Sequence, residues 1–154
     1  MKLEETDVKI LGELQRNAKI SYRELSENTR IPSSTLHDRI KKMTEEGVIR
    51  EYITTISDEA IGCTQIVIIG VETGAELYGS VASNLTKLPE VTEVYGTTAQ
   101  YDLMIKLRAY NRHHLGDTLN KIRNIQGVND INVAIALEVF KEEHTIPIMP
   151  EYIL

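Results

Sequence analysis

The stretch that most constrains the fold runs from residue 21 to residue 47 and predicts two short helices joined by a tight turn. Ser21 is a favourable N-cap, and Glu24 stands three residues later, so together they form a capping box. The first helix is expected to end near Arg30, because Pro32 disfavours helical geometry in the residue before it. A helix-turn-helix arrangement is therefore the first expectation.

The second helix of this pair has one apolar face. It is expected to begin at Pro32 or Ser33 and to end at Gly47, a residue favoured after helix C-termini. Three apolar residues recur at helical spacing and are expected to face inward, namely Leu36, Ile40 and Met43.

The opposite face of the second helix carries hydroxyl, imidazole, carboxylate and ammonium groups. Helical geometry predicts that the side chains at the centre of this face are Ser34, Asp38 and Lys41. The side chains at its two edges are Thr35, His37 and Lys42. Such a helix suits the major groove of DNA, where hydroxyls contact base edges or phosphates, Asp accepts from cytosine, and Lys reaches guanine or phosphate. From this stretch alone, an αα-hairpin inside an ordinary helical core is the alternative.

Charge is distributed unevenly along the chain. The 154 residues carry a net charge of −6, with 42% hydrophobic and 26% charged residues, as expected of a globular protein. Residues 1–56 hold ten Lys/Arg and ten Asp/Glu, whereas residues 57–154 hold seven and thirteen. A neutral head with a locally basic helix can bind DNA, but its modest affinity favours a dimer that doubles the phosphate contacts.

The rest of the first 56 residues completes a small winged domain. A helix before the pair, capped by Thr6 or Asp7, is expected to have an apolar face formed by Ile10, Leu11, Leu14 and Ala18. Residues 48–56 are rich in β-branched residues and predict two short strands that form a wing or hinge, with Arg50 near a phosphate. The polar segment before Gly62 predicts a hinge over residues 57–63.

Residues 64–154 predict an α+β domain of the ferredoxin-like type. Strands are expected at 64–72, 91–98, 101–109 and about 128–140, and helices at about 77–88 and after Asn111. Residues 85–94 and 122–131 repeat the same order of helix end, turn and strand start, which supports a duplicated βαββαβ order. The sheet face without helices is expected to be partly apolar and to form a homodimer.

The last segment, residues 142–154, contains two prolines and is expected to lack a helix. It is either an extended arm packed on its own domain or an arm that crosses to a neighbouring subunit.

Catalytic and cofactor signatures are absent from the sequence. It contains no phosphate-binding glycine loop, no dinucleotide fingerprint and no His-Glu-x-x-His motif. His113 and His114 are adjacent, so on a helix they cannot bind one metal. The single cysteine, Cys63, excludes an internal disulfide and a Cys-based zinc site. We expect a cytoplasmic protein without cofactor, metal, membrane anchor or catalytic residues.

The chain resembles the Lrp/AsnC family, the feast/famine transcription regulators, from about residue 3 to residue 148. The residues that carry the resemblance are Asp7, Ile10, Leu11, Leu25, Arg39-Ile40, Gly47-Val48-Ile49, Tyr52, Ile61-Gly62 and Tyr101-Asp102-Leu103. The resemblance implies a DNA-binding head followed by an effector-binding and oligomerising (RAM) domain. It also implies dimers that assemble into tetramers or octamers, and an amino-acid effector bound between dimers.

Two sets of site residues follow from the helix pattern and the resemblance together. The expected DNA-binding residues are Ser21, Tyr22, Ser33, Ser34, Thr35, His37, Asp38, Arg39, Lys41, Lys42 and Arg50. The expected effector-binding residues are Thr98, Ala99, Gln100, Tyr101 and Asp102, at the place of the family's Gly-x-Tyr-Asp loop.

Three positions depart from the family pattern. Ala99 stands where the family usually has Gly, which narrows the space beside the loop backbone and would cost about 1 kcal/mol or more in a left-handed conformation. A small amino acid, an altered ligand and no ligand all remain open. Arg30 stands where the turn often has Gly, and Asp38 repels phosphate unless it reads a cytosine.

Two other functions remain open at this stage. The siroheme decarboxylases of alternative haem synthesis resemble the same family, and their substrate would need cationic or histidine side chains, for which the candidates are Arg108, Arg112, His113 and His114. The other is an architectural DNA-binding protein with little sequence preference.

Overall fold

The computed structural model describes residues 2–153 and divides into two compact units. The first unit joins Met1–Thr55 to Glu142–Leu154, and the second comprises Ile56–Lys141. The segment expected as a hinge, residues 57–63, groups with the second unit, and the tail, residues 142–153, groups with the first unit instead of with the sheet. We refer to residues 2–55 as the head.

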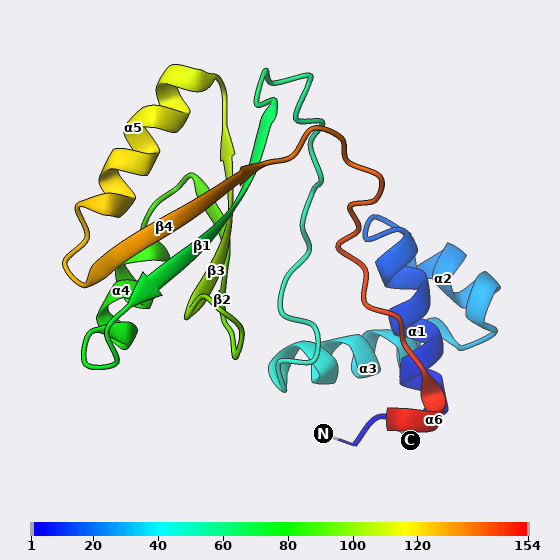
Figure 1. Ribbon diagram of the computed structural model, residues 1–154. Coiled ribbons are helices and arrows are strands. Elements are labelled where there is room, and N and C mark those ends of the chain that lie inside the picture. The colour runs from blue at the N-terminus through cyan, green and yellow to red at the C-terminus, as the bar shows by residue number, and fades with distance from the viewer. Residues whose placement is uncertain (1, 154) are drawn as a thin grey trace. The chain divides into compact units, whose positions relative to one another are not determined.

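The head consists of three helices, α1 (Glu5–Arg16), α2 (Tyr22–Thr29) and α3 (Ser33–Glu45) (Figure 1). The capping box of α2 is confirmed, since the Ser21 hydroxyl accepts from Glu24 N–H at 3.2 Å and Ser21 N–H donates to the Glu24 carboxylate at 3.1 Å. The three inward-facing residues of α3 are buried as predicted, and the head core comprises Ile10, Leu25, Leu36, Ile40, Met43 and Ile49.

The first helix begins earlier than expected. Its N-cap is Glu4 and not Thr6 or Asp7, and Glu4 N–H donates to the Asp7 carboxylate at 2.9 Å in a second capping box. The helix ends at Arg16, so Ala18 lies beyond it and is exposed, and the expected apolar face is one residue shorter.

Arg30 closes α2 in a left-handed conformation, with φ 58° and ψ 32°. A residue with a Cβ is strained in the left-handed conformation by about 1–2 kcal/mol. Glycine removes this strain, but it also makes the unfolded chain more flexible, which lowers stability by a smaller amount. We therefore expect Arg30→Gly to raise the free energy of unfolding of the head by about 0.5–1 kcal/mol. Urea unfolding measures this gain, with Arg30→Ala as the control that keeps the strain. A head that Arg30→Gly destabilises would contradict the assigned strain.

The two short strands expected over residues 48–56 are wrong, because that segment contains no strand. Val48 N–H and Ile49 N–H both donate to the Met43 carbonyl, so they extend the end of α3, and residues 50–56 are exposed. Tyr52 instead borders an apolar hollow of about 290 Å³ in the head, together with Leu14, Ala18, Ile20, Tyr22, Leu25 and Ile40. Partial burial there raises the pKa of the Tyr52 hydroxyl. The segment thus packs through its tyrosine and without a β ladder.

The tail contacts the head through its backbone. With the Gln15 amide nitrogen turned toward Ile146, the amide donates to the Ile146 carbonyl at 2.9 Å and accepts from the Ile146 N–H at 3.3 Å. The tail ends in a short helix, α6 (Pro150–Ile153), which corrects the prediction of no helix. Proline is tolerated there because the first turn of a helix does not use its N–H groups.

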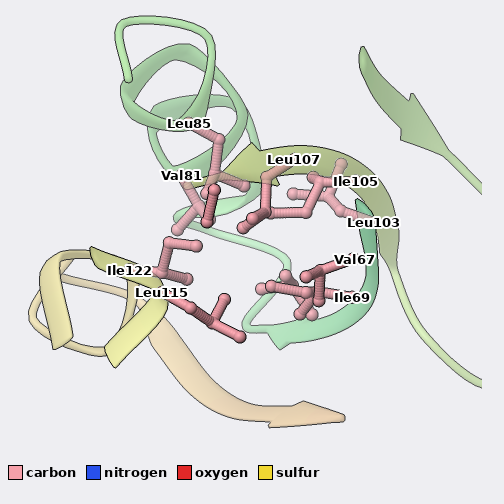
Figure 2. Close-up of a cluster of buried hydrophobic side chains, with 11 residues drawn as sticks. Val67, Ile69, Val81, Leu85, Leu103, Ile105, Leu107, Leu115 and Ile122 are labelled. Carbon is pink, nitrogen blue, oxygen red and sulfur yellow. The ribbon is translucent and has the colours of Figure 1, made fainter. Parts of the chain in front are cut away.

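The second unit has the predicted βαββαβ order, and its core is shown in Figure 2. Its elements are β1 (Gln65–Thr73), α4 (Tyr78–Leu85), β2 (Val91–Gly96), β3 (Leu103–Ala109), α5 (Arg112–Arg123) and β4 (Val128–Ile135). The strands form one antiparallel sheet in the order β2-β3-β1-β4, and both helices cover the same face (Figure 1). The predicted ferredoxin-like fold is confirmed.

The alternation along β3 separates the two faces of the sheet. Leu103, Ile105 and Leu107 are buried against α4 and α5, while Met104 and Lys106 lie on the face without helices, here called the open face. Val67 and Ile69 of β1 pair with Leu107 and Ile105 and complete this layer of the core, which Figure 2 shows.

The last strand is shorter than predicted and ends at Ile135. Its final backbone contact is Ala136 N–H to the Ile66 carbonyl, at the start of β1, so the chain beyond has no strand to pair with. Leu137 and Phe140, expected within the strand, are 96% and 92% exposed.

The N-cap of α5 is confirmed, because the Asn111 side chain accepts from His114 N–H at 2.9 Å. A buried carboxylate, that of Glu90, ties this helix to the start of β2 through Lys121 Nζ at 2.7 Å and His114 Nε2 at 3.3 Å. The ammonium of Lys121 lowers the pKa of Glu90 more than the other groups around it. Among residues 2–153, no helix is both long and apolar enough to cross a lipid bilayer.

Candidate nucleic-acid interface and effector loop

The outer face of α3 is built as the sequence predicts. Its six predicted side chains are all exposed, namely Ser34, Thr35, His37, Asp38, Lys41 and Lys42. Leu36 and Met43, on the opposite side, are fully buried, which fixes the rotation of the helix about its axis. The helix therefore presents a continuous polar surface with hydroxyl, imidazole, carboxylate and ammonium groups.

The charged groups on this surface are only loosely paired. His37 Nδ1 lies 3.8 Å from the Asp38 carboxylate, and Lys41 Nζ lies 3.9 Å from the Glu45 carboxylate. Exposed pairs of this kind contribute about 0–1 kcal/mol, so a phosphate or a base edge can replace either partner at little cost. Asp38 remains the one acidic group in the middle of the set.

The start of α2 adjoins the same surface. The Tyr22 ring lies 5.9 Å from the His37 ring, centroid to centroid, and Tyr22 is 44% exposed. The hydroxyl of Ser21 is used in the capping box, so its first role is to hold the start of α2. Ser33 at the first position of α3 and Arg50 beyond it are exposed.

Arg39, which was predicted among the DNA-binding residues, does not point outward with the others. Its guanidinium makes two hydrogen bonds to the Asp7 carboxylate on α1, at 2.7 and 2.5 Å, and contacts Glu4 at 3.1 Å. The Asp7 side chain is fully buried and that of Arg39 is 19% exposed. The hydrogen bond to Asp7 raises the pKa of Arg39 further above its ordinary value. Arg39 therefore holds α3 against α1 and does not add to the exposed basic set.

The predicted effector loop is a closed turn between β2 and β3. Thr97 N–H donates to the Asp102 carbonyl at 3.0 Å, and the Thr97 hydroxyl donates to the Tyr101 carbonyl. The Asp102 carboxylate accepts from Thr73 N–H at 2.8 Å, which ties the loop to the end of β1. The loop ends are therefore fixed within one subunit.

The five predicted loop residues divide into two groups. Tyr101 lies with its ring over Gly70 of β1, where an added Cβ would collide with the ring, and Asp102 holds the end of β1. Thr98, Ala99 and Gln100 are exposed at the tip. Arg30 is the non-glycine residue with positive φ among residues 2–153, so Ala99 avoids the left-handed conformation that would have strained it.

Sequence reasoning missed three residues of these sites. The sequence indicates Asp7 as a cap and a family match, yet its carboxylate is the buried partner of Arg39. No motif singles out Gly70 or Thr73, although a glycine inside the apolar run of β1 is a known sign of close approach.

The four residues considered for an enzyme have other partners or lie in solvent. Arg108 Nε donates to the Asp58 carboxylate at 2.8 Å. His114 Nε2 lies 3.3 Å from the Glu90 carboxylate and is hydrogen-bonded to it. Arg112 is exposed, as is His113, whose Nε2 lies 3.6 Å from the Asp117 carboxylate.

Comparison with known proteins matches both units. A family model for winged helix-turn-helix DNA-binding domains covers residues 3–50, and a model for the Lrp/AsnC ligand binding domain covers residues 66–146. The HTH-type transcriptional regulator FL11 of Pyrococcus horikoshii is 41% identical over 146 residues, which is 95% of this chain and 97% of the relative. The chain belongs to the Lrp/AsnC family.

Solved structures of this family superpose closely on the chain. AsnC of E. coli is 30% identical, with a TM-score of 0.85 over 94% of this chain and 97% of that protein. The transcriptional regulator NMB0573 of Neisseria meningitidis, solved as a complex with L-Met, is 25% identical, with a TM-score of 0.88 over 94% and 96%. As an Lrp/AsnC protein, the chain is a transcription regulator with a DNA-binding helix-turn-helix and a ligand-binding domain.

Proposed function

We propose that this Lrp/AsnC protein binds specific DNA sites as a cytoplasmic homo-oligomer and that an amino acid modulates its assembly and its affinity for DNA. The observation that carries the DNA part is the outer face of α3, where six polar side chains are exposed opposite a buried apolar stripe. In a dimer, two such helices would enter successive major grooves of a two-fold symmetric site.

Within this proposal the residues take different roles. Lys41, Lys42 and Arg50 contact phosphates and supply affinity, because ammonium and guanidinium groups release counterions from DNA. Hydroxyl, imidazole and carboxylate groups read base edges, and they come from Ser33, Ser34, Thr35, His37 and Asp38. Arg39 takes no part in contacts with DNA and positions α3 instead.

The open face of the sheet supports the proposed dimer. Ile68 is 36% exposed there, and Tyr95 of β2, which faces the same side as Met104, is 56% exposed. Leu137 and Phe140 add two almost fully exposed apolar side chains beyond β4. Burying such groups against a second copy of the chain is worth about 1.5–3 kcal/mol for each large side chain.

The amino-acid effector is supported by the family and by the loop. The matched domain is described as ligand-binding, and a relative of similar fold was solved with L-Met. The exposed tip of the loop, at Thr98, Ala99 and Gln100, stands on two fixed ends and is open to a ligand. A ligand changes assembly only to the extent that it binds the assembled and dissociated states differently.

Base reading by Asp38 is the sharpest test of sequence specificity. We expect Asp38→Ala to change the preferred base at one position of each half-site, because a carboxylate accepts from the amino group of cytosine and is repelled by the acceptor atoms of guanine and thymine. Overall affinity should rise, because a negative charge facing the DNA is removed. Selection of binding sites from random DNA by the variant and by the original protein measures the change, with the exposed Glu27→Ala as the matched control. An unchanged preference would show that Asp38 reads no base.

A further inference from the structure

A tyrosine outside the predicted effector loop reaches the residue where the loop begins. Tyr78 is the first residue of α4, and its hydroxyl lies against the backbone of Gly96, where an added Cβ would collide with that oxygen. Gly96 ends β2 and is followed directly by Thr97, which closes the loop. Gly96 does not have a positive φ, so the obstacle to a larger residue there is the Tyr78 hydroxyl and not the backbone conformation.

The hydroxyl of Tyr78 is available to a ligand. The side chain is 39% exposed, and no hydrogen bond of this hydroxyl is found among residues 2–153. Its neighbours in the loop are already engaged, since the Thr97 hydroxyl bonds to the Tyr101 carbonyl and the Asp102 carboxylate bonds to Thr73 N–H. A phenol can both donate to a carboxylate and accept from an ammonium group, the two groups that every free amino acid carries.

The two tyrosines near the loop lie on different faces of the sheet. Gly70 pairs with Met104 and belongs to the open face, so the Tyr101 ring lies there. Gly96 pairs with Leu103 of the core and belongs to the helix face, where Tyr78 approaches from α4.

We propose that Tyr78 is a binding residue for the amino-acid effector and donates its hydroxyl hydrogen to the effector carboxylate. This inference rests on the proposed function, since it requires that an amino acid binds at the loop 97–102. It gives α4 a direct part in recognition of the effector, so a bound effector would contact a helix of the domain core as well as the loop.

The first experiment tests the geometry without any ligand. Gly96→Ala should destabilise the second unit in the original chain, whereas in the Tyr78→Phe background it should be tolerated, because the Tyr78 ring carbon Cζ lies 3.4 Å from the added Cβ. Gly74→Ala is the matched control, since an added Cβ there meets nothing within 4 Å. Thermal unfolding is measured for four full-length proteins: the original, Gly96→Ala, Tyr78→Phe and the double variant. The difference between the double effect and the sum of the single effects gives the coupling between the two residues, and additive effects would overturn the assigned contact.

The second experiment measures ligand binding by the full-length protein. Isothermal titration with each standard L-amino acid identifies the ligand of the original chain, and Tyr78→Phe should weaken its binding about tenfold, as expected for one lost hydrogen bond to a charged group. Tyr110→Phe, which is also exposed, should bind as the original does. Equal affinity of Tyr78→Phe and the original would overturn the inference alone. Failure of the original to bind any standard L-amino acid would overturn the proposed effector and the inference together.

Discussion

Replacing Arg39 with methionine is expected to destabilise the head by about 3–5 kcal/mol, because the change leaves the buried Asp7 carboxylate without its charged partner. Three hydrogen bonds from the guanidinium to Asp7 and Glu4 are removed at once. Much of the head should unfold, since a loss of this size is comparable with the whole stability of a small domain. Amide hydrogen exchange in α1–α3 measures the loss, with the amides of β1 and β3 as an internal reference.

A double variant separates this role from a role in DNA binding. Asp7→Leu combined with Arg39→Met removes both charges, and the head should regain most of its stability, as happens when a buried ion pair is replaced by apolar groups. DNA affinity should then return close to that of the original protein. If Arg39→Met instead keeps the exchange rates and lowers affinity and its salt dependence, Arg39 contacts phosphate as its position in the sequence suggests.

Reversing the charges of Lys41 and Lys42 is expected to weaken DNA binding more than a hundredfold at near-physiological salt. In each dimer about four phosphates would no longer be neutralised by lysine, and as many repulsive charges would face the DNA. The slope of log affinity against log salt should fall by about 0.9 for each phosphate that is no longer neutralised. The head should stay folded, because both residues are exposed on α3. Fluorescence anisotropy with labelled duplex DNA over a range of salt concentrations measures both quantities.

The matched control reverses the same number of charges away from the head. Lys87→Glu with Arg123→Glu changes two exposed residues of the second unit and should leave DNA affinity within about twofold, apart from a small general effect of net charge. Equal losses in both double variants would mean that net charge, and not the surface of α3, governs binding.

Local rules were sufficient to predict most of the head. The capping box at Ser21 and the spacing of Leu36, Ile40 and Met43 were enough to place α2 and α3 and to orient α3. The role of Arg39 could not be predicted in this way, since its partner Asp7 lies 32 residues earlier, on another helix. Angular position on a helix describes where the Cα lies, and a long side chain can still reach a neighbouring helix.

The strand prediction from composition failed in two segments that have no neighbouring strand to pair with. Residues 48–56 and 136–140 have β-branched and apolar residues in partial alternation, yet neither segment forms a strand. A strand needs a partner for its backbone groups, and β1, which pairs with β4, begins only at Gln65. Composition describes a side-chain preference, whereas the ladder depends on what lies beside the segment.

The effector loop was located by resemblance, but its construction was not predictable from its own residues. Tyr101 and Asp102 contact Gly70 and Thr73, which belong to β1 and lie about 30 positions earlier. From the sequence alone, Gly96 suggests only local flexibility, whereas in the structure it leaves the space that Tyr78 fills. Glycines at close approaches can be recognised in a sequence, but the residue that approaches them cannot.

Selection of binding sites from random duplex DNA, at near-physiological salt and with and without a mixture of amino acids, tests the central claim most directly. The proposed function predicts recovery of a two-fold symmetric motif and a change in its enrichment when amino acids are present. Recovery of no motif, with binding that fades as salt rises, would contradict sequence-specific regulation and would favour an architectural role for the head.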